Sequence, residues 1–166
     1  MMPAREARRC KRSEGGIGMR AVAMRVAHAQ VRIGEETVAA IGPGQAALVG
    51  FGRDDSPSDI DWMTRKLHAL RIFQDETGRL RHSADDLGLP HLLVPQFTLY
   101  GDVSRGHRPD FGPALPPDAA QEMWRDFLTR FGPAACGVFG ADMRFLLEND
   151  GPVTILIDSQ ADRSRP

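Results

Sequence analysis

A glycyl-proline step directly before an apolar β run is the feature that most constrains this chain. Residues 149–154 read Asn-Asp-Gly-Pro-Val-Thr, and the segment from Val153 to Ile157 is typical of a buried strand. Proline removes a ladder donor and restricts the residue before it, and an X-Pro bond reaches cis at modest cost. The step at Gly151-Pro152 is therefore either a rigid backbone device, with carbonyl oxygens that can face a ligand, or a plain turn.

The chain has 166 residues, 42% of them hydrophobic, which suits one domain with its own core. Residues 1–18 lack periodicity, so we expect a disordered N-terminal extension, followed by a domain over 19–158 and a flexible tail over 159–166. Two cysteines, Cys10 and Cys136, are too few for a disulfide framework, which makes a reducing cytoplasm the expected location. No apolar run has transmembrane length, so no membrane partner is expected.

Hydrophobic spacing predicts an α+β domain with two main helices and mainly antiparallel strands. A helix beginning at Ser56, with Pro57 and Asp59 in its first turn, and a second helix over 118–131 are predicted. Segment 80–91 is predicted to be mostly irregular, and 101–117 to be a long structured loop. The predicted strands lie at 22–26, within 31–41, and at 46–51, 71–73, 92–94, 137–139, 143–147 and 153–157.

The charge distribution limits the kind of nucleic-acid contact that this chain can make. Between residues 19 and 158 there are fourteen basic and nineteen acidic residues, a net charge of about -5. Such a body argues against a wide, non-specific grip on a phosphate backbone, which needs many cationic contacts. Any nucleic-acid contact is therefore expected to be local.

Familiar cofactor and metal motifs do not occur in this sequence, so neither a cofactor nor a metal ion is expected. The remaining candidates are Gln96, Phe97 and Thr98, which follow a buried strand. A hydroxyl, an amide and successive backbone N–H groups at a strand end can form an anion hole. The alternative is that Thr98 is an ordinary β-branched strand residue and that Gln96 is merely solvated.

Several segments together resemble the D-aminoacyl-tRNA deacylase family over residues 19–158, in the family's order and spacing. Gln-Phe-Thr-Leu at 96–99 is a weak signal alone, but it becomes strong when Asn-Asp-Gly-Pro-Val-Thr follows some 50 residues later. The resemblance also supports Met19 as a family-like start. The segments that carry it are 19–22 with Arg25, 70–73, 96–100, 106–111, 139–143 and 149–154.

The resemblance implies a homodimeric three-layer β/β/α sandwich that hydrolyses the ester joining a D-amino acid, or glycine, to the 3′ end of a tRNA. This activity is chiral proofreading in translation. Gly151 and Pro152 would be joined by a cis bond, would enter the partner subunit's pocket, and would exclude an L side chain sterically. Gln96, Phe97 and Thr98 would line the catalytic cleft, with Thr98 binding substrate, and their N–H groups would hold the oxyanion. Arg25 would fix the Gly-Pro segment.

Two departures from the family pattern keep alternative functions open. Pro95 stands where family members usually have serine, and Met24 stands where glutamine is common. These departures leave open a catalytically silent RNA-binding dimer and a deacylase with relaxed chirality. The acidic body leaves open a third alternative, a hydrolase of small esters that acts without tRNA. For tRNA contact the local candidates are Arg105, His107 and Arg108 in the long loop, which is otherwise simply solvated.

Overall fold

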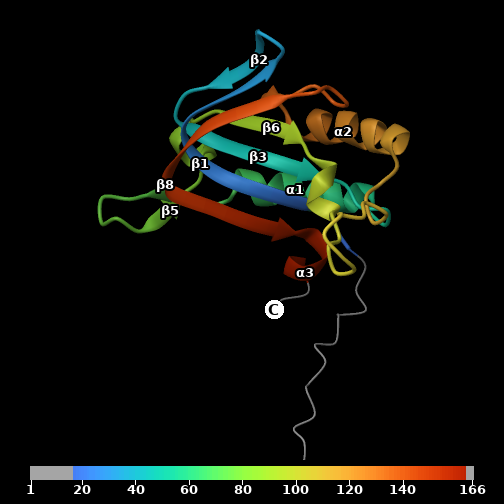
Figure 1. Cartoon of the computed structure of the whole chain (residues 1–166). Coiled ribbons are helices and arrows are strands. Elements are labelled where there is room, and N and C mark those ends of the chain that lie inside the picture. The colour runs from blue at the N-terminus through green and yellow to red at the C-terminus, as the bar shows by residue number, and fades with distance from the viewer. Residues whose placement is uncertain (1–16, 164–166) are drawn as a thin grey trace, which may run out of the picture.

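A six-stranded sheet forms the centre of the structure, a computed structural model that describes residues 17–163 (Figure 1). The strand order is β2-β1-β3-β6-β7, and β8 pairs with the other edge of β1. β1 is antiparallel to β2, β3 and β8, whereas β6 is parallel to both β3 and β7. The strands are β1 (Arg20–Ile33), β2 (Glu36–Ile41), β3 (Gly44–Gly50), β6 (His91–Pro95), β7 (Ala135–Cys136) and β8 (Arg144–Asp158).

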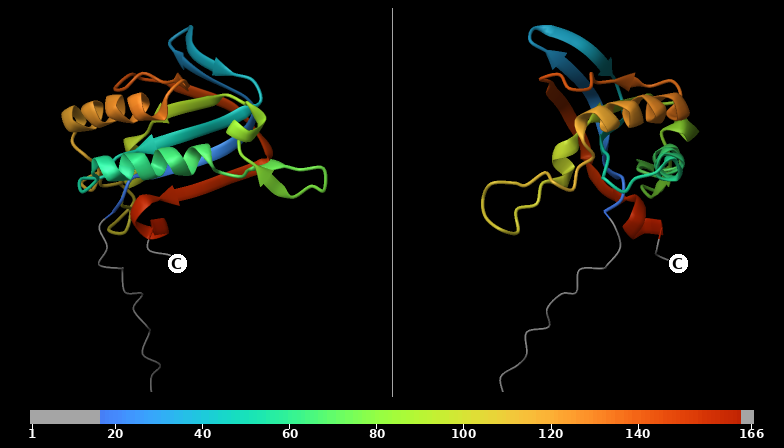
Figure 2. Two further views of the ribbon diagram at one scale, coloured as in Figure 1. Left: turned by 180° about the vertical axis from the view of Figure 1, so that it is seen from behind. Right: turned by 90° about the vertical axis from the view of Figure 1, so that its right-hand side faces the viewer.

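Two main helices, α1 (Pro57–His68) and α2 (Pro117–Phe131), cover one face of this sheet (Figure 2). α1 begins where predicted, because the Ser56 N–H donates to the Asp59 carboxylate at 2.9 Å. Each helix buries one stripe against the sheet, and each large buried side chain contributes about 1.5–3 kcal/mol. The buried helix residues include Ile60, Met63, Leu67, Ala120, Trp124, Phe127 and Phe131.

A second β layer covers part of the opposite face. β1 and β8 are long, and their pairing changes register between residues 24 and 28 of β1. β2 pairs with the part of β1 that follows this change. β2 contacts β6 and β7 without pairing with either of them. A separate apolar cluster, built around Val31, Leu92 and Val94, fills the space between these layers. The predicted α+β fold and its β/β/α layering are therefore confirmed.

Part of the helix-free face stays open to solvent. Leu156 of β8 pairs with Val22, Val22 pairs with Leu48, and Leu48 pairs with Val94, so these four apolar residues lie side by side across four strands. Leu156 is 79% exposed, and Val22 and Leu48 are half-buried. We call Leu156, Val22 and Leu48 the apolar row. Within residues 17–163, no helix has the length and apolar character needed to cross a membrane.

Several predictions about local structure are wrong. Of the predicted strand at 71–73, only Phe73 lies in a strand. The segments 143–147 and 153–157 belong to one continuous strand, β8, because β1 pairs with both halves. Residues 137–139 leave the sheet, since the Ala141 N–H turns back to the Val138 carbonyl at 3.3 Å. Segment 80–91 also contains β5 (Leu80–His82), which pairs with β4 (Phe73–Gln74), and the 3-10 helix η1 (Asp85–Leu87).

The ends of the domain meet at one place. The predicted flexible tail is wrong for residues 159–163, which form the short helix α3 (Ser159–Arg163). Ser159 is fully buried, and its hydroxyl is satisfied there because it donates to Asp59 at 2.9 Å and accepts from the Met19 N–H at 2.9 Å. The predicted extension over 1–18 lies outside the described residues except for Ile17 and Gly18.

Candidate functional site

The turn that follows β6 brings the predicted anion-hole residues together. The Gln96 N–H donates to the Val49 carbonyl at 2.7 Å, which extends the pairing of β6 with β3. The chain then enters the 3-10 helix η2 (Phe97–Tyr100). The first N–H groups of a 3-10 helix have no carbonyl behind them within the helix, so those of Phe97 and Thr98 are suited to bind an anion. The prediction that the Gln96 N–H also binds the anion is wrong, because this N–H already donates to the Val49 carbonyl.

The side chains of this turn point to binding and not to nucleophilic attack. The Gln96 amide donates to the Thr98 hydroxyl. An amide takes up no proton at neutral pH, so this contact orients the hydroxyl without activating it. The Phe97 ring is 57% exposed, and it packs edge-on against Phe111 with 5.1 Å between ring centroids.

Two hollows lie on either side of Phe97. One of about 300 Å³ is lined by residues 94–97 of β6 and the turn, by residues 140–143, and by Phe145 of β8. The other, of about 350 Å³, lies between Phe97, Phe111 and the start of α2. An exposed aromatic ring between two hollows is suited to stack against a planar group such as a nucleobase.

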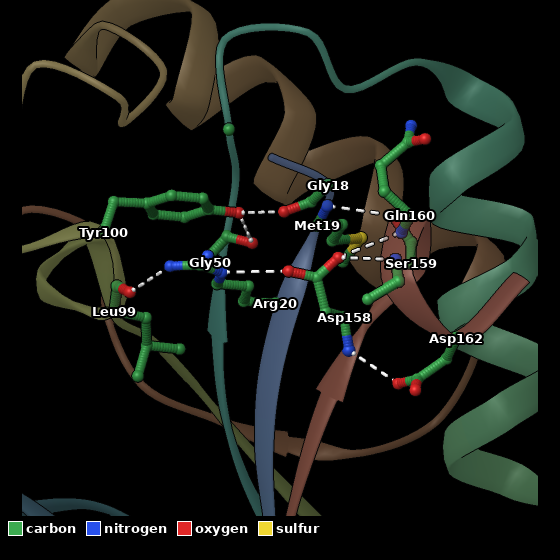
Figure 3. A network of polar contacts seen from close by, with 12 residues as sticks. Gly18, Met19, Arg20, Gly50, Leu99, Tyr100, Asp158, Ser159, Gln160 and Asp162 are labelled. Carbon is green, nitrogen blue, oxygen red and sulfur yellow. Dashed lines mark hydrogen bonds and ion pairs between the residues drawn. The ribbon is translucent and has the colours of Figure 1, made fainter. Parts of the chain in front are cut away.

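A polar network fixes η2 to the neighbouring strands (Figure 3). Arg20 donates to the Leu99 carbonyl at 3.0 Å and forms an ion pair with Asp158 at 3.1 Å. The buried Tyr100 hydroxyl lies 2.8 Å from the Gly18 carbonyl and 3.0 Å from the Gly50 carbonyl, which share its single hydrogen. Burial raises the pKa of Tyr100, so it stays a neutral donor. The turn is therefore held by β1, β3 and β8 together.

Asp55, beside this network, gives the fold a pH dependence. Burial raises the pKa of its carboxyl to about 7, although the Gly52 N–H, which donates to it at 2.7 Å, opposes the shift. In the unfolded chain this pKa is about 3.8. The folded state therefore holds an extra proton between these values, and the stability that the proton contributes is lost as pH rises toward and through 7.

We expect Asp55→Asn to gain stability relative to the wild type as pH rises from 5 to 8, because asparagine carries no charge to bury and the wild type loses its extra proton over this range. Discounted for partial exposure, the gain between these two pH values is about 1–2 kcal/mol, or roughly 3–6 °C in Tm. Thermal melts of both proteins at the two pH values measure it. A Tm difference that does not change between pH 5 and pH 8 contradicts the raised pKa of Asp55.

A bend in the middle of β8 presents the Gly151-Pro152 step. β1 pairs Val26 with Asn149 and Met24 with Thr154, so four residues of β8 face a single residue of β1. The Gly151-Pro152 peptide bond is cis, and Gly151 has φ +124°. The Val153 N–H donates to the Asn149 side chain at 2.8 Å, which closes the base of the bend. Residues 150–152 are exposed, so the bend projects from the sheet.

Arg25 is the residue of β1 that faces the bend. It is 8% exposed, and its guanidinium donates to the Asp150 carbonyl at 2.9 Å and to the Ile72 carbonyl at 2.9 Å. It also lies 3.3 Å from the Asp150 carboxylate. A rigid, permanently charged donor fork can hold two carbonyls at fixed positions. Arg25 therefore ties the bend to the segment before β4.

The bend and the turn lie far apart within one chain. Along β1, Arg20 contacts η2 whereas Arg25 contacts the bend, and five strand residues span about 17 Å. The middle of β8 lies beside β5 at one end of the sheet, and the segment after β6 lies at the other (Figures 1 and 2). An aminoacyl group is shorter than this distance, so the bend and the turn of one chain cannot contact the same group.

The structure thus assembles the predicted site residues into two sets. Pro95, Gln96, Phe97 and Thr98 share the turn. Arg25, Gly151 and Pro152 share the bend. Sequence reasoning missed the supporting residues Arg20 and Asp158, although opposite charges at the two extremities of the domain are a usable signal.

Comparisons with known proteins agree over nearly the whole domain. The sequence model of the family described as D-Tyr-tRNA(Tyr) deacylase matches residues 22–158. A D-aminoacyl-tRNA deacylase from Chlorobaculum tepidum is 46% identical over 146 residues, which is 85% of this chain and 97% of the relative. Another, from Desulforudis audaxviator, is 44% identical over 146 residues, covering 86% of this chain and 98% of the relative.

Solved structures give the same fold. The c-Myc DNA Unwinding Element Binding Protein superposes with a TM-score of 0.79 at 38% identity, covering 83% of this chain and 97% of that chain. A probable eukaryotic D-amino acid tRNA deacylase superposes with a TM-score of 0.73 at 16% identity, covering 86% of this chain and all of the other. At that identity the second likeness concerns the fold alone.

Proposed function

This chain belongs to the D-Tyr-tRNA(Tyr) deacylase family, and on that premise we propose that it hydrolyses the ester bond of D-aminoacyl-tRNA and of glycyl-tRNA. It is a hydrolase that acts on aminoacyl-tRNA, and the activity removes D-amino acids before they enter translation. Aminoacyl-tRNA is consumed in the cytoplasm, which is where we place the enzyme. The observation that carries the proposal is the bend of β8, where Arg25 holds Gly151 and Pro152 outside the sheet.

The chemistry that we infer depends on the backbone of the turn. Water attacks the ester carbonyl carbon, the bond to the ribose oxygen breaks, and that oxygen takes the proton as the amino acid leaves. The N–H groups of Phe97 and Thr98 stabilise the oxyanion that forms in between, and one such donor is worth about 3 kcal/mol. The ribose 2′-hydroxyl assists the water, while Gln96 and Thr98 position the terminal adenosine, whose base stacks on Phe97.

Selection between D and L substrates is assigned to the bend. The carbonyls of Gly151 and Pro152 occupy the space that an L side chain needs, while a D side chain points away from them. A wall of main chain is suited to this task, because a fixed carbonyl cannot rotate aside as a side chain does. Glycine has no side chain to reject, so it passes.

The bend is proposed to act on the partner's cleft in a homodimer. Within one chain, the β1 residues that contact η2 and the bend are about 17 Å apart, so a second copy is needed to bring both parts to one substrate. A two-fold dimer presents the same surface twice, and each bend then enters the other subunit's hollow. The exposed apolar row gives this contact a hydrophobic patch on the helix-free face.

The two departures from the family pattern, Met24 and Pro95, leave Gly151 and Pro152, the residues proposed to select D substrates, unchanged. Met24 is 8% exposed and belongs to the apolar cluster between the β layers, so it acts through packing. Pro95 pairs in register with Val49 and lines the hollow, where it supplies neither a hydroxyl nor an N–H. Strict rejection of L substrates is therefore proposed to persist, because it depends on Gly151 and Pro152.

The long loop between η2 and α2 is the proposed contact for the tRNA strand near its 3′ end. The Asp102 and Asp110 backbones exchange two hydrogen bonds, of 2.8 and 2.9 Å, which close the loop at its base. Arg105, His107 and Arg108 lie exposed between them. A local cationic group of this size suits a few phosphates, in keeping with the acidic body.

The direct test compares matched substrates. Purified protein is incubated with D-Tyr-tRNA, L-Tyr-tRNA and Gly-tRNA, and the loss of the acyl group is followed. We expect rapid hydrolysis of the D and glycyl esters and little hydrolysis of the L ester. Equal rates for D and L esters would indicate a relaxed-chirality deacylase, whereas the absence of any hydrolysis would indicate a silent RNA-binding dimer.

Thr98 distinguishes a backbone mechanism from a nucleophilic one. We expect Thr98→Ser and Thr98→Ala to retain D-Tyr-tRNA hydrolysis within about tenfold of the wild type, the effect of one lost neutral hydrogen bond. Removal of a true nucleophile costs several orders of magnitude. Single-turnover rates of the three proteins measure the difference, and a loss of that larger size in Thr98→Ala alone would establish a nucleophile.

A further inference from the structure

Two histidines and an aspartate from three different elements meet at the far end of β6. His68 ends α1, Asp85 begins η1 and His91 begins β6. Nδ1 of His68 lies 2.8 Å from one carboxylate oxygen of Asp85, and Nε2 of His91 lies 2.7 Å from the other. The three donor groups offer ligand atoms that all lie within 4.8 Å of one another.

The hydrogen bond of His68 Nε2 determines whether Nδ1 of the same ring donates or accepts. Nε2 of His68 lies 3.0 Å from the Phe131 carbonyl, which only accepts, so this nitrogen carries the hydrogen. In the neutral ring, Nδ1 then presents a lone pair to the Asp85 carboxylate. Two acceptors at 2.8 Å need a cation between them, either a second proton on the ring or a metal ion.

His91 and Asp85 connect the site to the core and to solvent. His91 is 5% exposed, so its ring reaches the Asp85 carboxylate from inside the core. Buried Gln45 places its amide nitrogen 3.5 Å from Nδ1 of His91. The Asp85 side chain is 47% exposed, which leaves a path for an ion from solvent.

We propose that His68, Asp85 and His91 form a binding site for a divalent transition-metal ion of the Zn²⁺ type. Two imidazole nitrogens and one carboxylate are a donor set that suits Zn²⁺, Co²⁺ or Ni²⁺ and is unsuited to Mg²⁺. Ligating histidines usually donate their other ring N–H to a carbonyl, as His68 does to Phe131. The Phe131 ring also stacks on His68 at 4.1 Å, which fixes the plane of that ligand.

The role of this site is to fasten elements together. Through its three ligands and Phe131, it joins the ends of α1 and α2 to η1 and to the first residue of β6. The catalytic turn begins after Pro95, four residues further along β6, or about 13 Å away. The ion therefore takes no part in ester hydrolysis, and its effect is on stability. The ligands lie 17 and 6 residues apart in sequence, a spacing that matches no metal motif.

Metal titration of the full chain, first stripped with a chelator, tests the proposal. We expect one Zn²⁺ per chain with a Kd below about 1 µM by calorimetry. At a hundredfold excess over Kd the Tm should rise by roughly 5–10 °C. Co²⁺ should give visible absorption bands typical of nitrogen and oxygen ligands, whereas Mg²⁺ should neither bind nor shift the Tm.

Variants distinguish this site from adventitious surface binding. Asp85→Asn and His68→Gln should weaken Zn²⁺ binding by more than about 100-fold, since loss of an outer-shell partner alone costs 10–100-fold. His28→Gln is the matched control, because His28 and Glu148 form an exposed pair at 3.2 Å elsewhere. Circular dichroism of the metal-free variants verifies folding, and deacylation should stay unchanged. Failure of the wild type to bind Zn²⁺, or equal binding by Asp85→Asn and wild type, would mean that a proton holds the cluster.

Discussion

Replacing Gly151 by alanine is expected to lower the rate of D-aminoacyl-tRNA hydrolysis by about 100-fold or more, the loss that a displacement near 1 Å causes. A Cβ atom at this position would lie 2.5 Å from Nη2 of Arg25 and 3.0 Å from Cγ2 of Val153. The φ of +124° is also one that L side chains rarely adopt. The bend must therefore move relative to Arg25, and the carbonyls that face the substrate move with it.

Gly78→Ala is the matched control for this experiment. Gly78 lies in the turn between β4 and β5 with φ +79°, and no atom would lie within 4 Å of its added Cβ. This substitution carries a similar backbone cost of about 1–2 kcal/mol but leaves the bend in place, so the rate should be unchanged. Rates on D- and L-Tyr-tRNA are compared for both variants. Equal activity of Gly151→Ala and Gly78→Ala would remove the bend from the mechanism.

Leu156→Arg is expected to produce a monomer at micromolar concentration and to lower D-aminoacyl-tRNA hydrolysis by about 100-fold or more. Leu156 is 79% exposed and stands at the end of the apolar row on the helix-free face. A new charge there would have to be buried without a partner in a dimer that covers this face. Each cleft would then lack the bend of the other subunit.

Light scattering coupled to size exclusion measures the assembly, and deacylation measures the consequence. The control is Leu87→Arg on η1, where the native leucine is 46% exposed and lies away from the apolar row. This variant should remain dimeric and active. A fully active Leu156→Arg monomer would contradict a cleft shared between subunits. An active Leu156→Arg dimer would indicate that the interface lies on another face.

Much of the fold follows from local patterns in the sequence. The helix beginning at Pro57 is visible in the residues around Ser56, because the capping interaction is made entirely by near neighbours. The stripe of α2 is visible for the same reason. The continuity of β8 is not visible in the sequence, because a glycyl-proline step normally ends a strand. Only the pairing of both halves with β1 joins them into one strand. The burial of Ser159 is not visible in the sequence either, since its partners Met19 and Asp59 are distant in sequence.

The site shows the same division between what is local and what is not. Gln96, Phe97 and Thr98 are adjacent in sequence, so their shared turn could be predicted. The use of the Gln96 N–H by Val49 could not, because that bond depends on the register of β6 against β3. The contact of Arg25 with the Asp150 carbonyl joins residues 125 apart, and only the family resemblance suggested it.

Strand β8 has a consequence for inheritance. It lines its own chain's hollow through Phe145 and carries the bend a few residues later, so in the proposed dimer every catalytic centre combines parts of two copies of the chain. In a cell that makes both normal chains and chains with a damaged bend, a mixed pair keeps one working centre. Such a mutation would behave as recessive, and two alleles damaged in different parts would partly rescue each other.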